Sequence, residues 1–81
     1  MSNDLIIPNG NVFVLQNVTQ LGSAVREKRK TDGLTQQDLA AIANVGVRFV
    51  SDFENGKPTV QFDSVMSVLQ ALGLQLSVSP K

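Results

Sequence analysis

The stretch LTQQDLAAIANVGVRFVSDFENG, residues 34–56, decides the fold of this chain. Thr35 and Asp38 stand three residues apart, which is the spacing of a capping box, so we expect a helix to begin directly after Thr35. A second helix is predicted after Gly46, because apolar residues there recur three positions apart and the sequence ENG is typical of a helix end. The stretch therefore predicts two short helices that meet at a tight corner over residues 44–46.

Two further helices are predicted on either side of this corner. Asn17 and Gln20 match a capping box, and the pair DG at residues 32–33 favours a helix end, so a first helix is expected between them. A fourth helix is predicted from the pair PT at residues 58–59 to Gly73, because apolar residues recur there at spacings of three and four. The inward stripe of this fourth helix is Phe62, Val65, Met66, Leu69 and Leu72.

Both ends of the chain carry short runs that favour β structure. Residues 1–16 contain DLII and VFVLQ on either side of the turn-forming PNGN, so a short hairpin and a loosely ordered arm both remain open. After the fourth helix, Leu74, Leu76 and Val78 alternate with polar residues, which predicts a strand. A single strand leaves its backbone N–H and C=O groups unpaired, so this one needs a partner.

The composition excludes several classes of function. The chain has 81 residues, enough for one domain over residues 17–81, and it contains neither Cys nor His. This excludes disulfides, thiol nucleophiles, the usual zinc sites and catalytic triads; we expect no enzyme and no bound cofactor or metal. No membrane span or signal peptide is visible, so a cytoplasmic protein is expected. Seven basic and seven acidic residues cancel, and net charge therefore gives no support to nucleic-acid binding.

Two helices joined by so short a turn form a helix-turn-helix, whose second helix lies in the major groove of DNA. Residues 34–56 align without a gap with the helix-turn-helix of the Xre family, which includes the small phage repressors, and the resemblance extends to the HipB-like antitoxins. The matching phrases are TQL in the first helix, RFVSDFENGKPT around the third, and LQALGLQL leading into the predicted strand. Most of this family has Gly at the position of Asn44 and Ser or Thr at that of Gly46, so the third helix here should lack a hydroxyl cap.

The resemblance implies that the start of the third helix reads DNA bases. Arg48 lies at its second position, where a bidentate contact with guanine would discriminate between bases by about 1–3 kcal/mol; a solvated surface arginine is the alternative. Val47 matches another base-reading position, where it could meet a thymine methyl group or lie half-buried under the turn. Asp52 could accept a hydrogen bond from cytosine, but we favour an ion pair with Arg48, four residues earlier.

Four residues are candidates for contacts with the DNA backbone. The resemblance implies that Gln36, at the start of the second helix, binds a phosphate, where backbone N–H groups and the helix dipole suit an anion. Asn55 and Lys57, just beyond the third helix, are expected to contact the backbone for the same reason. Phe49 points partly outward by helical phase, so it packs either on the sugar wall of the groove or against the second helix.

The basic run REKRK, residues 26–30, has a separate interpretation. In the family, the arginine at the position of Arg29 pairs with the glutamate at that of Glu54, so these two residues are expected to tie the first helix to the end of the third. Arg26 and Lys30 could approach phosphate, although a solvated face is the more common outcome for such runs.

Together these features predict an all-α, four-helix, lambda-repressor-like domain with a C-terminal β-strand. The resemblance implies that this strand pairs with its counterpart across a two-fold homodimer, through Leu74, Leu76 and Val78. The two third helices would then face successive major grooves about 34–36 Å apart, and the double-stranded DNA operator should be palindromic.

The resemblance also implies a function and a partner. The function is repression of the protein's own operon, and the partner is a HipA-like kinase toxin or a split version of it with an extra small subunit. One alternative is a protein-interaction module that holds the toxin and binds DNA weakly, which the zero net charge favours. Another is a phage-type repressor without a toxin.

Overall fold

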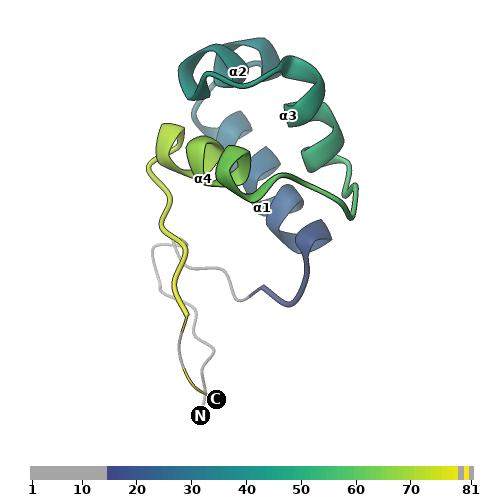
Figure 1. Ribbon diagram of the computed structural model, residues 1–81. Coiled ribbons are helices and arrows are strands. Elements are labelled where there is room, and N and C mark those ends of the chain that lie inside the picture. The colour runs from purple at the N-terminus through teal and green to yellow at the C-terminus, as the bar shows by residue number, and fades with distance from the viewer. Residues whose placement is uncertain (1–14, 79, 81) are drawn as a thin grey trace.

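A computed structural model describes residues 15–78 and residue 80. Four helices follow one another: α1 (Val18–Thr31), α2 (Gln36–Ala43), α3 (Val47–Glu54) and α4 (Phe62–Ala71). Helix α2 packs on both α3 and α4, and α1 packs on α3 (Figure 1). The predicted all-α architecture of four helices is confirmed. No helix within the described residues combines the length and apolarity needed to cross a membrane.

The helix ends follow from the capping residues that the sequence supplies. The Asn17 side chain accepts a hydrogen bond from the backbone N–H of Gln20 at 2.9 Å. The Thr35–Asp38 capping box is complete, with bonds of 2.9 and 3.0 Å in the two directions. These side chains satisfy backbone N–H groups that have no partner inside a helix, and so they fix where α1 and α2 begin.

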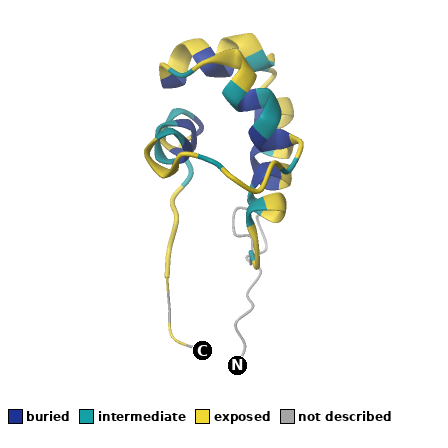
Figure 2. Cartoon of the chain, turned by 45° about the vertical axis from the view of Figure 1, so that its right-hand side comes forward, coloured by how far each residue is buried: buried dark blue, intermediate teal, exposed yellow. Residues whose placement is uncertain are grey.

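The core lies where the inner faces of the four helices meet (Figure 2). Its largest fully buried side chains are Val25, Leu39, Val50, Phe53, Val65 and Val68. Val50 and Phe53 had been predicted as the buried face of the third helix, and both are 0% exposed. The anchoring of α3 is therefore settled by two apolar side chains three residues apart.

Helix α4 differs from the prediction at its start. It begins at Phe62 with Gln61 as its N-cap, not at residues 58–59. Phe62 was expected on the inward stripe but is 65% exposed, because it lies in the first turn, outside the core. Val68, absent from the predicted stripe, is fully buried instead.

Gly22 sets the distance between α1 and the end of α3. A Cβ atom added at Gly22 would lie 2.0 Å from the carbonyl oxygen of Phe53, closer than any side chain tolerates. Only glycine therefore allows this close approach of the two backbones. Because α3 carries the predicted DNA-reading residues, Gly22 helps to position them.

The predicted C-terminal strand is not present in the described residues, none of which forms a strand. Leu74 still turns back, its N–H donating to the carbonyl of Leu69 at 2.8 Å, but residues 75–78 run away from the helical body as an irregular segment (Figure 1). The physical reason is that a strand exists only beside a partner, and the described part of this chain provides none. The predicted hairpin or arm, residues 1–16, falls outside the described residues except for its last two.

Candidate nucleic-acid interface

The corner between α2 and α3 is built on a left-handed asparagine. Asn44 has φ 58° and ψ 47°, a conformation that asparagine tolerates better than most residues with a Cβ. The N–H groups of Asn44 and Val45 donate to the carbonyls of Ala41 and Ala40 at 3.3 and 3.0 Å, which closes the end of α2. Asn44 thus occupies the left-handed position of the corner, where a glycine would be unstrained.

Gly46 is the N-cap residue of α3. Its φ of −73° is open to any residue, and it caps α3 without a side-chain hydrogen bond, so the expected absence of a hydroxyl cap is observed. A Cβ at this position would meet nothing within 4 Å. The glycine at position 46 is therefore required neither by the backbone angle nor by packing.

Helix α3 has one buried and one open face. Arg48 is exposed and Val47 is 43% exposed, whereas Val50 and Phe53 on the other side are completely buried. Phe49 is half-buried, and its ring stacks on that of Phe53 with centroids 5.7 Å apart. The open face is thus held rigidly by the apolar residues behind it.

The expected ion pair between Arg48 and Asp52 does not form. Asp52 instead lies 3.5 Å from the Nζ of Lys57, with their side chains 37% and 54% exposed. The Lys57 N–H also donates to the carbonyl of Asp52 at 3.0 Å, so the loop after α3 folds back and brings the lysine to the carboxylate. Arg48 consequently has no ion-pair partner among the described residues.

Arg29 and Glu54 form a buried, bidentate ion pair. The Arg29 Nε donates to one carboxylate oxygen at 2.7 Å and its Nη2 to the other at 2.9 Å. The two side chains are 10% and 1% exposed. Hydrogen bonding to Glu54, aided by the charge attraction and opposed by burial, raises the pKa of Arg29 above its ordinary value. The Nη1 also donates to the Leu34 carbonyl at 2.8 Å, so Arg29 joins α1 to the α1–α2 loop as well as to α3.

Gln36 takes part in the same cluster. Its Nε2 donates to Glu54 at 3.1 Å, which connects the start of α2 to the end of α3. An amide nitrogen carries two N–H donors, so this bond leaves one for a phosphate. The sequence carried no signal for the link, since the two residues lie 18 positions apart.

The remaining predicted site residues and basic residues lie at the periphery. Asn55 is exposed and forms the C-cap of α3. Arg26 and Lys30 are exposed on α1, whereas Lys28 pairs with Asp32 at 3.0 Å. The structure thus brings Arg29, Gln36 and Glu54 together and leaves Arg48 open to the solvent.

Comparison with known proteins identifies the family to which this chain belongs and two relatives of similar sequence. The family model described as Helix-turn-helix (HTH_3) matches residues 25–78. The HTH-type transcriptional regulator y4mF of Sinorhizobium fredii is 42% identical over 64 residues, which cover 79% of this chain and 84% of that protein. Human endothelial differentiation-related factor 1 is 30% identical over 57 residues, 70% of this chain but 38% of its own length.

Solved structures give the same picture of the fold. HipB in the HipA-HipB-O2-O3 complex superposes with a TM-score of 0.79 at 26% identity, covering 85% of this chain and 97% of that one. HipB in the HipB-O4 20mer complex gives the same values. The restriction-modification controller protein C.AhdI of Aeromonas hydrophila, also 26% identical, has a TM-score of 0.66 and covers 72% of this chain and 88% of its own.

Proposed function

This chain belongs to the helix-turn-helix family of DNA-binding transcriptional regulators, and we propose that it is a repressor that acts as an antitoxin. In this proposal it binds a palindromic operator of its own operon as a two-fold dimer, in the cytoplasm. The similarity to HipB in complexes with and without HipA supports both the DNA and a HipA-like kinase toxin, whole or split, as partners.

The observation that carries the proposal is the two-sided character of α3. Val50 and Phe53 fix the helix in the core, while Arg48 and Val47 remain open on the other side. An arginine on such a face can form two hydrogen bonds with the O6 and N7 atoms of guanine, which no other base pair offers in that arrangement. We therefore assign the base contacts to Arg48, Val47 and Asp52.

Contacts with the DNA backbone would surround these base contacts. The second N–H of the Gln36 amide and the backbone N–H groups at the start of α2 suit a phosphate, and so do Asn55 and Lys57 beyond α3. The pairing of Lys57 with Asp52 would reduce the repulsion between that carboxylate and the phosphates. Phe49 contributes its exposed edge while its ring stays on Phe53.

A gel-shift titration with the DNA upstream of the gene tests the proposal. Arg48→Ala should lose about 1–3 kcal/mol of binding free energy on the specific site and little on unrelated DNA. Arg26→Ala is the matched control, because Arg26 is also exposed and its loss removes the same charge. Equal effects of the two substitutions would show that Arg48 contributes only charge and would remove it from the base contacts.

An interaction module with weak DNA binding is the second candidate, and the formal net charge of zero favours it. Neutralising phosphates releases counterions, so log affinity should fall with log salt by about 0.9 per phosphate contact. A steep slope supports the repressor, whereas a flat slope would favour the interaction module. A phage-type repressor without a toxin remains the third candidate, and the genes beside this one distinguish it.

A further inference from the structure

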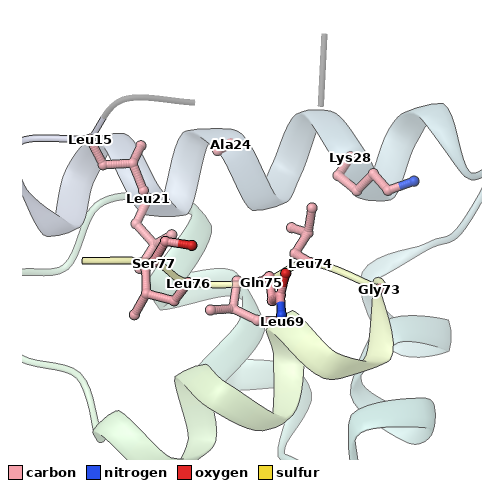
Figure 3. A pocket seen from close by; sticks show the side chains of 10 residues that line it. All are labelled: Leu15, Leu21, Ala24, Lys28, Leu69, Gly73, Leu74, Gln75, Leu76 and Ser77. Atoms are coloured by element: carbon pink, nitrogen blue, oxygen red, sulfur yellow. The ribbon is translucent and has the colours of Figure 1, made fainter. Parts of the chain in front are cut away.

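Two neighbouring basic residues of α1 have different surroundings. Lys28 lines an open groove between α1 and the segment after α4 (Figure 3), and its side chain pairs with Asp32 while remaining partly exposed. Arg29 is buried instead, where it holds the carboxylate of Glu54 at the end of α3. Arg29 is thus the buried basic residue of the run REKRK, and its contacts lead toward the proposed DNA-binding surface.

The Arg29 guanidinium fixes the start of α2 through the loop before it. Its Nη1 donates to the Leu34 carbonyl at 2.8 Å, and the Leu34 N–H donates back to the Arg29 carbonyl at 3.1 Å. Leu34 stands two residues before Gln36, the first residue of α2. Arg29 therefore holds the backbone from which the Gln36 side chain extends.

The Glu54 carboxylate in turn fixes the Gln36 side chain. Its Oε1 accepts hydrogen bonds from the Arg29 Nη2 at 2.9 Å and from the Gln36 Nε2 at 3.1 Å. An ionised carboxylate only accepts hydrogen bonds, so the Gln36 amide must turn its NH2 group toward Glu54 and its carbonyl oxygen away. A free amide can rotate by half a turn and exchange these two groups. The bond to Glu54 thus selects one orientation of the two.

Charge neutralisation explains how a carboxylate can lie beside a group that binds phosphate. A free carboxylate would repel a phosphate, but both Glu54 oxygens accept from the Arg29 guanidinium, and the Glu54 side chain is 1% exposed. The half-buried Gln36 amide is the part of this cluster closest to solvent. Given the repressor function proposed above, we propose that Glu54 is a positioning residue for DNA binding, whose carboxylate, fixed by Arg29, holds the Gln36 amide ready to donate its second N–H to a phosphate.

Nuclear magnetic relaxation of the glutamine side-chain amides in the free protein tests the positioning without DNA. The Gln36 amide should be as rigid as the helix backbone, with an order parameter of about 0.85, whereas that of its exposed neighbour Gln37 should fall below about 0.6. Glu54→Gln should release Gln36, because an amide offers one acceptor oxygen where the carboxylate offers two. Equal mobility of Gln36 and Gln37 in the wild type would overturn the proposal, even if Glu54→Gln does not fold.

Gel shift with the DNA upstream of the gene tests the link to binding, at a temperature where circular dichroism shows every variant to be folded. Gln36→Ala should weaken binding about tenfold. Glu54→Gln should weaken it about three- to tenfold, because the competent amide orientation becomes a minor population. In the Gln36→Ala background, Glu54→Gln should cause no further loss.

Glu27→Gln is the matched control, because it removes the same charge from an exposed site on α1, and it should leave binding nearly unchanged. A merely structural role of Glu54 predicts the same loss of binding with and without Gln36, and that result would overturn the proposal. If the wild type does not bind this DNA, the repressor function fails. If it binds and the two losses are equal, only the positioning role fails.

Discussion

The helix pair α2–α3 and the segment after α4 differ in how their backbone N–H and C=O groups find hydrogen-bond partners. The helices satisfy most of these groups internally, and the Thr35–Asp38 capping box satisfies two more at the start of α2. Residues 75–78 have no such internal solution, because strand hydrogen bonds join different segments. The comparison shows why one region is complete within a single chain while the other is ready for a partner.

The largest expected loss of stability comes from removing the buried ion pair of the helical region. Glu54→Ala leaves the buried Arg29 guanidinium without its partner and should lower the free energy of unfolding by about 3–5 kcal/mol. A domain of this size is stable by about 4–12 kcal/mol, so urea unfolding should show a greatly reduced midpoint. Glu27→Ala, an exposed change on α1, is the control and should stay within about 0.5 kcal/mol. Similar midpoints for the two variants would contradict the structural role of the pair.

A second substitution should weaken the proposed dimer contact of the segment after α4 and leave the helices intact. Leu76→Glu places a charge on the proposed dimer strand and should raise the dimer dissociation constant about a hundredfold, from the loss of apolar burial in both copies. Gln70→Glu, which adds the same charge at an exposed position on α4, is the control. Sedimentation equilibrium measures both, and circular dichroism should show unchanged helices. A dimer that survives Leu76→Glu would place the interface elsewhere.

A smaller loss of stability is expected when the hydrogen bond from Gln36 to Glu54 is removed. Gln36→Met keeps the size of the side chain but removes its hydrogen bond to the Glu54 carboxylate, which should cost about 1–2 kcal/mol of stability. A double-mutant cycle with Glu54→Gln, measured by urea unfolding, should show the two positions coupled. If Gln36→Met weakens DNA binding while stability and coupling are unaffected, its role is confined to the phosphate.

The smallest effect concerns the cap of α2. Hydrogen bonds from the Thr35 backbone, and then from its side chain, hold the pKa of Asp38 below its ordinary value of 3.8. The folded state therefore favours the charged carboxylate, and this contribution to stability is present above the unfolded pKa and lost as the pH falls through the folded one. Thermal unfolding temperatures of the wild type and Asp38→Asn should therefore converge as the pH falls below 3.8. Curves that remain parallel over this range would exclude the contribution.

Whether a feature of the site could be predicted depends on how far apart in the sequence its interacting residues lie. The caps, the corner and the buried face of α3 were predictable because each depends on residues within four positions of one another. The link from Gln36 to Glu54 and the pairing of Asp52 with Lys57 were not predicted, since both depend on how α3 ends and where the following loop turns. The start of α4 was placed too early, at residues 58–59, because proline is common at the first position of a helix. The helix begins at Phe62 instead, with Gln61 as its N-cap.

The sequence by itself determined the four helices, the caps of α1 and α2 and the open face of α3, because backbone preferences and apolar periodicity are local properties. Only the tertiary structure decided how closely α1 approaches α3, which depends on the missing Cβ of Gly22, and that Gln36 joins the predicted Arg29–Glu54 pair. It also decided that residues 75–78 stay unpaired within the described chain. Alternating apolar and polar residues show that a segment can form a strand, but only a second segment beside it can supply the hydrogen bonds.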